Sequence, residues 1–594
     1  MEYKSENRIC VNCKKDFIIE PDDFGFYEKI KVPPPTFCPE CRLVRRLAWR
    51  NEKSLYRNEC KKCKQSIISV YSKDSGMTVY CRPCWWGDDW DDMATQIEFN
   101  ESQTFFEQLN ELIYKAPVPS LFGAYITLYN SEFTNMVGDL KNCYLLTHSD
   151  HSENCFYGST ITSSKDCVDN TMLDESELCY ENMNCQKSYQ VFYSVDCAAC
   201  RNIYFCKNCV DCSDCFGCVN LRNKKYHIFN QAYSKEAYQE ELKKLGLDSY
   251  QQTKETKKRT ISFWEKFPQK YIHERHNHLV SGDYIYNSKN TLNSYVVDEI
   301  ENSKFCAYVS AGTKTADCYD FTHFGASSEL LYESLQAGNV AANLRFCFFT
   351  ILNTSDLEYC LFCTGSKNCF GCVGLKKKKY CIFNKQYSKE EFFKFKEKII
   401  SHMNRLPFID KKGNKYKYGE FYPIEFSPFG YNATTAQEFF PLSKDEVNKE
   451  GYKWKVPEEK NYKIDILAKD LPDITENVGD DILSKVISCE HEGKCNEQCT
   501  EAFKIIPDEL AFYRRMNLPL PRLCSNCRHY QRHKFVNPPK VWRRSCMCGS
   551  TGSLQATGKH FHGEEKCEVE FETSYAPDRS EVIYCERCYQ QEVY

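Results

Sequence analysis

Several features that define common protein classes are missing from this sequence. No run of about 18 apolar residues is present, which excludes a helix that spans a bilayer. The opening residues, MEYKSENRIC, carry no apolar export signal, so we expect a cytoplasmic protein with reduced thiols and no membrane contact. The net charge is only −4, which argues against a protein that coats nucleic acid through its overall charge.

Catalytic signatures are missing as well. The chain contains no phosphate-binding loop, no Gly-x-Ser-x-Gly and no His-Glu-x-x-His. We therefore expect a non-enzymatic protein and identify no small-molecule substrate. A zinc-dependent nuclease stays open as an alternative, because the His-Phe-His-Gly run at 560–563 contains two residues that can act as metal ligand or base.

What the sequence does contain is cysteine, 38 of them in 594 residues. A chain of this length is expected to fold as several domains. Reduced cysteines either bind metal or are buried as small apolar groups, and the position of each cysteine decides between these roles.

The two ends of the chain are copies of each other, which indicates internal duplication. An offset of 486 carries Cys13 onto Cys499 and continues without a gap to Cys60, which falls on Cys546. The same offset pairs Phe26-Tyr27 with Phe512-Tyr513, Cys38 with Cys524, Cys41 with Cys527, Arg42 with Arg528 and Arg46 with Arg532.

Each copy is expected to bind two zinc ions, so that the chain holds about four. Four thiolates in two close pairs suit tetrahedral zinc and leave no open position for a substrate water. A knuckle, a hairpin carrying the Phe-Tyr pair and a cysteine pair opening a helix are typical of a treble clef, whose helix N-terminus favours thiolate. The expected ligands are Cys10, Cys13, Cys38 and Cys41; Cys60, Cys63, Cys81 and Cys84; Cys495, Cys499, Cys524 and Cys527; and Cys546, Cys548, Cys585 and Cys588.

Alternative ligands are present near the two C-terminal sites. Cys489 or His491 can take the place of Cys495 as the first ligand of the third site. In the fourth site, Cys567, His560 or His562 can replace one of the four expected cysteines. The spacing alone does not decide between these sets.

The pattern Cys-x-x-Cys-x-x-x-Phe, followed by Phe-Tyr, Pro and Cys-x-x-Cys-Arg, resembles an uncharacterised bacterial cysteine-rich family with zinc-binding treble-clef, or zinc-ribbon-like, domains. The resemblance covers residues 13–63 and 499–546. It departs at Cys495, whose pair has three spacer residues where the family has two. The resemblance implies zinc at both ends and brings no known activity.

Between the two ends, the sequence predicts a duplicated β-solenoid. Apolar residues recur every twelve positions from Cys143 through Cys155, Cys167 and Cys179, and an aromatic or aliphatic residue follows each of them. A strand and a turn of this length stack as coils about 4.8 Å apart. The segment beginning at Cys215 returns 154 residues later, at Cys369. The predicted fold is mainly β, with a few helices that cap the coils after Ser234 and Ser388.

Two features of the solenoid have alternative interpretations. The cysteines at 197–218 either fill a narrow interior or form a metal or redox site. The aromatic row is either buried or partly exposed as a binding ladder. The expected segments are 1–98, an N-terminal double zinc module; 99–124, a connecting helix; 125–245, the first solenoid copy with its cap; 246–285, a charged linker; 286–400, the second copy with its cap; 401–480, an extended connector; and 481–594, a C-terminal double zinc module.

These features lead to the hypothesis of a zinc-binding scaffold that recognises a macromolecule. Arginines follow the second cysteine pair at each end and predict a basic face for nucleic acid or a ribonucleoprotein. A protein-interaction scaffold that uses the solenoid surface, and a metal or redox protein that uses the solenoid cysteines, are the alternatives. The candidate nucleic-acid contacts are Arg42, Arg46, Arg57, Arg528, Arg532 and Arg543.

Overall fold

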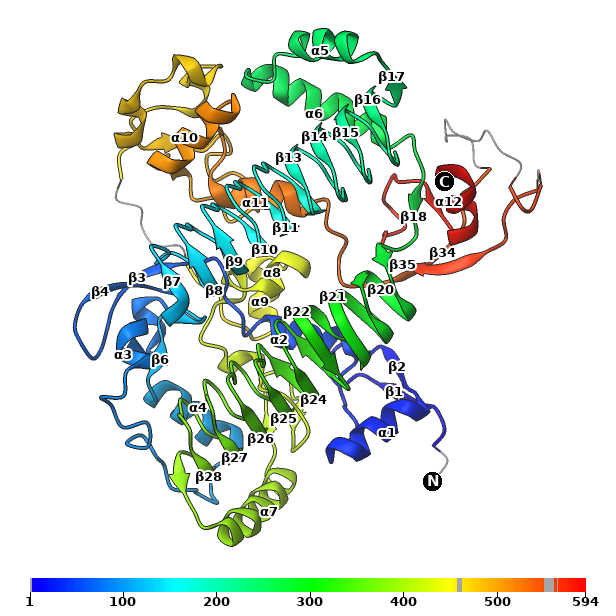
Figure 1. Ribbon diagram of the computed structural model, residues 1–594. Helices are drawn as coiled ribbons and strands as arrows, with labels where there is room; N and C mark the ends of the chain where they lie inside the picture. Colours follow the sequence, from blue (N-terminus) through cyan, green and yellow to red (C-terminus); the bar gives the residue numbers. More distant parts are fainter. Residues whose placement is uncertain (1–2, 457–461, 550–559, 564) are drawn as a thin grey trace.

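The computed structural model describes residues 3–456, 462–549, 560–563 and 565–594, without the side chains of 310–314. The chain is mainly β, and stacked coils of a β-solenoid form its largest part (Figure 1). Within the described ranges, no helix is both long and apolar enough to cross a membrane.

The first solenoid copy consists of short parallel strands stacked in chain order. Tyr144 pairs with Phe156, Phe156 with Val168 and Val168 with Tyr180, so the coil length is twelve residues, as predicted. The strands are β7 (Leu128–Tyr129), β8 (Asn135–Lys141), β9 (Thr147–Glu153), β10 (Ser159–Thr162), β11 (Thr171–Asp174), β12 (Met183–Gln186), β13 (Tyr189–Phe192), β14 (Arg201–Tyr204), β15 (Ser213–Phe216) and β16 (Lys225–Ile228), with β17 (Gln231–Ala232) antiparallel to β16.

Each coil is divided into shorter steps of three residues. Left-handed backbone recurs at Asn142, Leu145 and His148, with φ of 52°, 50° and 53°. The residue after each of these corners turns into the interior, and Cys143 and Leu146 are 3% and 0% exposed. Left-handed backbone is unfavourable for residues other than glycine, so hydrogen bonds between coils must hold the corners in place. The Cys-x-x-Cys spacing at 197–218 already carried this three-residue signal.

The second copy forms one sheet whose strands also follow chain order. Most of its coils are twelve residues long, but His278 pairs with Lys289 at an offset of 11, and insertions lengthen later coils, where Ser328 pairs with Ala341 and Ala341 with Thr354 at an offset of 13. The strands are β19 (Glu274–Arg275), β20 (His278–Tyr286), β21 (Lys289–Lys304), β22 (Ala307–Ala316), β23 (Tyr319–Thr322), β24 (Ser328–Leu335), β25 (Ala341–Arg345), β26 (Thr354–Glu358), β27 (Lys367–Phe370), β28 (Lys379–Ile382) and β29 (Lys385–Gln386).

The two copies lie side by side and run in opposite directions where they touch (Figure 1). The His148 and His323 rings are 3.3 Å apart between centroids. Gln186, which follows His148 in the first copy, accepts a hydrogen bond of 2.6 Å at Oε1 from Arg275, which precedes His323 in the second copy. As residue numbers increase in one copy they decrease in the other, which gives the pair of stacks an approximate two-fold arrangement.

Helices cover the last coil of each copy. Helix α5 (Lys235–Lys244) follows β16, and its N-cap Ser234 accepts a hydrogen bond from the Ala237 amide. Helix α7 (Lys389–Arg405) packs on β28 and has a full capping box between Ser388 and Glu391. A capping helix shields backbone groups that an open coil would leave unpaired. The expected linker 246–285 contains helix α6 (Tyr250–Trp264) and the first strands of the second copy.

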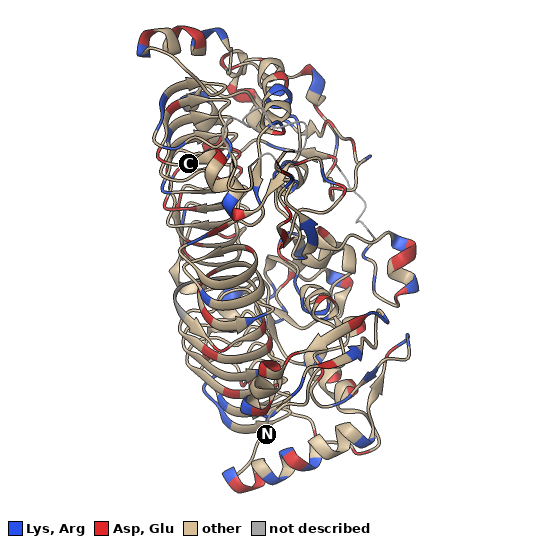
Figure 2. Cartoon of the chain, turned by 90° about the vertical axis from the view of Figure 1, so that its right-hand side faces the viewer, with Lys and Arg blue, Asp and Glu red and all other residues tan. Residues whose placement is uncertain are grey.

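The coils occupy one side of the molecule, and the cysteine-rich ends and the connectors cover the other (Figure 2). Each cysteine-rich end packs against the solenoid copy that is farther from it in the sequence, an arrangement we call crosswise docking. Helix α2 (Pro39–Leu47) of the N-terminal module contacts β23 and β24 of the second solenoid copy, whereas α11 (Ser525–His533) of the C-terminal module contacts β11 of the first. Helix α4 (Phe105–Lys115) lies in the expected connecting segment.

Candidate metal centres and their docking contacts

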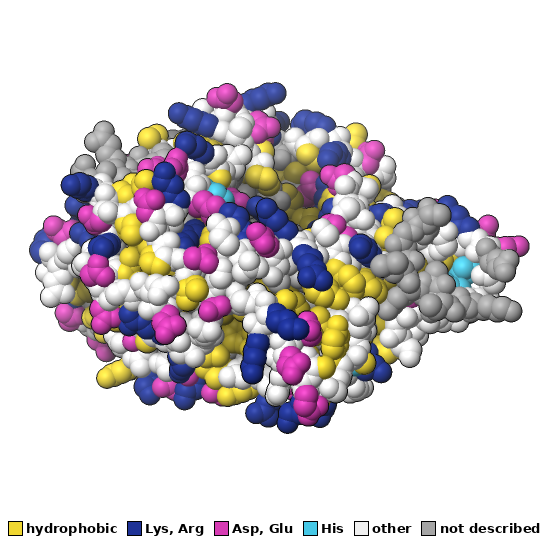
Figure 3. Space-filling model, turned by 90° about the horizontal axis from the view of Figure 1, so that it is seen from above, with side chains coloured by type: hydrophobic (Ala, Val, Ile, Leu, Met, Phe, Trp, Pro, Cys, Tyr) yellow, Lys and Arg dark blue, Asp and Glu magenta, His cyan; other side chains and the backbone are white. Residues whose placement is uncertain are grey.

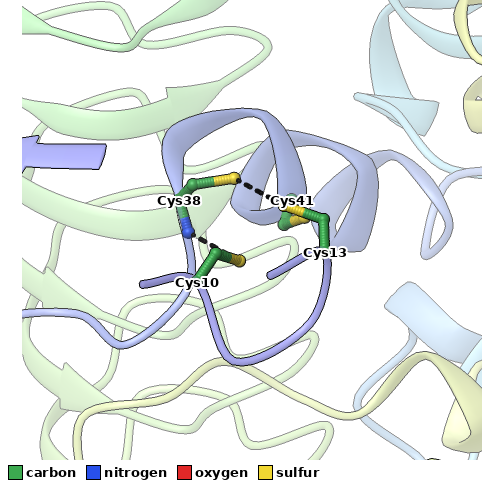
Figure 4. Close-up of side chains that lie close together, drawn as sticks. All are labelled: Cys10, Cys13, Cys38 and Cys41. Atoms are coloured by element: carbon green, nitrogen blue, oxygen red, sulfur yellow. Dashed lines mark hydrogen bonds between the residues drawn. The ribbon is translucent and has the colours of Figure 1, made fainter. Parts of the chain in front are cut away.

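The first cysteine cluster lies where a β-knuckle meets a helix. Strands β1 (Glu6–Ile9) and β2 (Asp16–Ile19) present Cys10 and Cys13, and α2 begins directly after Cys38. The sulfur atoms of Cys10, Cys13, Cys38 and Cys41 all lie within 4.8 Å of one another (Figure 4). The Cys13–Cys38 sulfur distance is 3.7 Å, close to the edge of about 3.8 Å that tetrahedral zinc requires with Zn–S bonds of about 2.3 Å. The Cys38 amide donates to Cys10 Sγ at 3.2 Å, which stabilises a thiolate.

The second cluster repeats this geometry. Cys60 and Cys63 lie on the turn between β3 (Tyr56–Glu59) and β4 (Ser66–Ser69), and Cys81 and Cys84 lie at the start of α3 (Arg82–Trp86). The Cys63–Cys81 sulfur distance is 3.8 Å, and the Cys81 amide donates to Cys60 Sγ at 3.2 Å.

The third cluster includes Cys489, which the sequence offered as an alternative to Cys495. The tetrad contains Cys489, Cys499, Cys524 and Cys527. The Cys524 amide donates to Cys489 Sγ at 3.3 Å, the same bond that Cys38 makes to Cys10 at the other end. Cys489 therefore occupies the place of Cys10. Cys495 remains adjacent, with its sulfur 3.7 Å from that of Cys527.

Strands β32 (Ile487–Ser488) and β33 (Ala502–Phe503) explain why the spacing did not distinguish Cys489 from Cys495. The knuckle cysteine follows its strand directly, as Cys489 follows Ser488, but the turn before Cys499 is longer than in the N-terminal copy. Cys495 lies among the extra residues of this turn, at a short distance in sequence from Cys499 that resembles the spacing of Cys10 and Cys13. A strand end at Cys489 was the signal that could have identified the equivalent residue.

The fourth cluster is the most crowded. Cys546, Cys567, Cys585 and Cys588 form one tetrad, and the Cys585 amide donates to Cys546 Sγ at 3.3 Å. The expected ligand Cys548 belongs to a second, overlapping set. The supporting elements are β34 (Trp542–Ser545), β35 (Glu570–Thr573), β36 (Ile583–Tyr584) and α12 (Glu586–Val593).

Buried arginines attach each module to the opposite solenoid copy. Arg42 and Arg46 both pair with Asp320, at 2.8 Å and 3.0 Å. These side chains are at most 1% exposed. Although burial opposes the charged guanidinium, Asp320 raises the pKa of Arg42 well above its usual value. Arg45 extends this cluster to Glu333, at 2.5 Å.

The C-terminal module makes the same contact through the residues 486 positions further on. Arg528 and Arg532 pair with Asp169 at 2.8 Å and 3.0 Å, and their side chains are 4% and 5% exposed. Arg528 also donates to the Leu523 carbonyl, as Arg42 donates to that of Phe37. Duplication has therefore preserved a complete docking device, which we call the arginine clamp: two arginines of a module and one aspartate of the solenoid.

The clamps correct the expectation of a basic face at each end. Arg42, Arg46, Arg528 and Arg532 point into the protein and are neutralised there, so nucleic acid cannot reach them. Of the six candidate contacts, Arg57 lies on the surface, and so does Arg543, which is 79% exposed and paired with Glu570. The sequence showed where these arginines are, but the carboxylates that neutralise the arginines are far away in the chain, so their burial was not predicted.

The Phe-Tyr pairs lie on helices, not on hairpins. Helix α1 (Pro21–Ile30) carries Phe26, whose ring stacks on Tyr319 with centroids 3.9 Å apart. Helix α10 (Pro507–Met516) carries Tyr513, whose ring lies 5.6 Å from that of Tyr180. Proline at the first helical turn and the acidic residues after it were the signals of these helices.

The solenoid cysteines are interior groups. Twelve in the first copy and eight in the second are all buried. Their thiols donate to backbone carbonyls, as Cys155 Sγ does to the Glu153 oxygen at 3.3 Å, and burial raises the pKa of Cys306 to about 12. The aromatic row is mostly buried too, and Tyr180 and Phe192 are 2% and 1% exposed. These observations support filling of a narrow core.

A group of histidines at the junction of the copies was not anticipated. A cavity of about 30 Å³ is lined there by His148, His529, His533 and Glu438. Burial lowers the pKa of His533 to about 4, so its imidazole is neutral. His148 and His323 each occupy a left-handed corner of a coil, and each directly follows a threonine. This shared Thr-His pair is visible in the sequence.

No protein-family model matches the chain, and no curated protein matches it. Among solved structures, one from Desulfovibrio desulfuricans G20, described as a "putative acetyltransferase", is 11% identical and covers 39% of this chain and 63% of that chain, with a TM-score of 0.09. The present chain thus spans less than two thirds of that structure's length. A superposition this poor carries no argument about fold or function.

Proposed function

We propose that the protein is a non-enzymatic, zinc-stabilised scaffold that binds a protein partner on the outer face of its double solenoid. The observation that carries this proposal is the pair of arginine clamps. Both modules use their arginines and Phe-Tyr pairs to hold the solenoid, so these groups serve internal packing. The face of the coils that points away from the modules is left for a partner (Figure 2).

The four cysteine centres fit this role. Each tetrad is closed by four protein ligands and is typical of structural zinc, which contributes directly to folding. We propose zinc as the metal, since thiolate sets of this geometry favour it. In this scheme the modules are zinc-dependent clasps that keep the two solenoid copies side by side.

The charge distribution on the outer face favours protein over nucleic acid. Lys165, Glu175, Glu177 and Lys187 are exposed on successive coils and alternate between the two signs. On the adjoining face that is seen from above, side chains of both signs are likewise interspersed (Figure 3). A nucleic-acid site requires a basic stripe, which such a surface does not provide. The nucleic-acid hypothesis therefore depends on the exposed Arg57 and Arg543.

A photo-crosslinking experiment tests the proposal in cells. A photoreactive amino acid replaces Ala199, an exposed outer-face residue, and in a control it replaces Ile18, which is 56% exposed on the N-terminal module. We expect a discrete, protease-sensitive adduct at 199 only, and its loss when Lys187 and Arg201 are changed to Glu. A nuclease-sensitive adduct, or equal labelling at both positions, would refute a protein partner on this face.

A further inference from the structure

The fourth cysteine centre contains more ligands than one zinc ion can use. Cys546, Cys567, Cys585 and Cys588 lie within 4.8 Å of one another, and so do Cys548, His562, Cys567 and Cys588. The two sets share Cys567 and Cys588. We propose that this centre holds two zinc ions bridged by these two thiolates.

The ligand atoms of the second set lie close enough together to share a metal ion. Cys548 Sγ lies 3.3 Å from Cys588 Sγ and 3.2 Å from His562 Nε2, and Cys588 Sγ lies 3.5 Å from the same nitrogen. A tetrahedral zinc with bonds of about 2.3 Å to sulfur and about 2.0 Å to nitrogen has edges of roughly 3.5–3.8 Å. In the first set, Cys567 and Cys585 are 4.0 Å apart, which fits the other zinc ion.

The loop that carries His562 is held in place by helix α12, which also supplies Cys588. His560 Nε2 lies 2.9 Å from Glu592 Oε2, and the Phe561 amide donates to Gln591 Oε1 at 2.9 Å. The Arg587 guanidinium stacks on the Phe561 ring at 3.7 Å. These three contacts fix successive residues of the loop, so the imidazole is placed before metal binds.

The charge of the centre also favours two ions. Its five cysteines are at most 4% exposed. If all five are thiolates, one Zn²⁺ leaves a net charge of −3, and two leave −1. Uncompensated charge is costly in a buried site.

The N-terminal copy provides an internal comparison. The offset of 486 that relates the two ends places Lys62 opposite Cys548, and the second centre contains only Cys60, Cys63, Cys81 and Cys84. One end therefore carries a four-ligand site and the other a six-ligand site on equivalent frameworks. The extra ligands are specific to the C-terminal module, which indicates a property that the N-terminal module lacks.

Metal counting on the full-length protein tests the proposal directly. Native mass spectrometry and elemental analysis are expected to give about five zinc ions per chain for the wild type and about four for both Cys548→Ser and His562→Ala. His278→Ala, which removes an exposed histidine of the solenoid, should retain the wild-type count. About four ions in the wild type and in both variants would overturn the proposal.

Cobalt substitution provides a second readout that does not depend on the folding of a variant. Two Co²⁺ ions that share thiolates couple magnetically, which weakens their electron paramagnetic resonance signal. In the fully loaded wild type, the number of spins measured from this signal should therefore be smaller than the number of bound cobalt ions. His562→Ala should bring signal and content into agreement. A wild-type signal equal to that of isolated cobalt ions would contradict the bridged pair.

Discussion

Removal of the Asp169 carboxylate provides the sharpest test of crosswise docking. This group neutralises Arg528 and Arg532, and all three side chains are at most 5% exposed. Asp169→Ala leaves two buried guanidiniums without their main partner, and breaking a buried ion pair typically costs about 3–5 kcal/mol. At about 1.4 kcal/mol per tenfold, the population of the undocked C-terminal module should rise roughly 100-fold to 4,000-fold.

Amide hydrogen exchange measures that population. Helix α10 shares an apolar core with the solenoid through residues such as Leu510, Tyr513 and Tyr180, and α11 contacts β11, so undocking should expose both helices. We expect faster exchange across residues 507–533 in the zinc-loaded variant. Protection within tenfold of the wild type would show that Asp169 does not hold the module on the solenoid.

The same coil offers a matched control. Asp166 pairs with Arg515 of the same module at 3.4 Å, but that arginine is 52% exposed. Asp166→Ala should therefore change the docking free energy by less than about 1 kcal/mol. Replacing Asp169 by Leu, Arg528 and Arg532 by Met, and Glu509, the other buried carboxylate paired with Arg528, by Gln should restore much of the docking, because the buried charges are removed as a set.

Three further predictions follow from buried groups. Burial opposes the charged form of the His273 imidazole, but the carboxylates of Asp283 and Asp196 outweigh it and raise the pKa to about 10 from an ordinary 6.5. The charged imidazole therefore stabilises the fold fully below pH 6.5, and this contribution is lost as the pH rises toward 10. The difference in melting temperature between the wild type and His273→Gln should shrink over that range, and a constant difference would contradict this. Burial lowers the pKa of His533 to about 4, so this residue takes up a proton on unfolding between pH 6.5 and 4, and acid destabilises the fold. The variant His533→Leu, which introduces the residue found at the equivalent position 47 of the N-terminal module, should therefore lose less stability in acid than the wild type. Chelation of metal should expose at most the 18 terminal cysteines to a thiol reagent, and the remaining 20 should react only in denaturant; reaction of the solenoid thiols in the native protein would refute their burial.

The sequence was sufficient for every feature that depends on local repetition. A twelve-residue period predicted parallel coils because each coil places equivalent residues on the same face, and the register of Tyr144 with Phe156 confirms it. Cysteine pairs at both ends predicted the metal clusters because ligand spacing within a knuckle is a short-range property. The three-residue corners of the coil were not predicted, although the Cys-x-x-Cys spacing at 197–218 carries their signal.

Contacts between distant segments were decided only by the tertiary structure. The arginines after each cysteine pair are basic in the sequence, but their role depends on Asp320 and Asp169, which are more than 270 residues away in the chain. Likewise, the choice of Cys489 depends on the strand that ends before it and on the helix that meets it in space. Composition and spacing determine which groups a segment offers. Whether a charge faces water or a buried partner is determined by the fold, because burial and pairing arise only when separate segments come together.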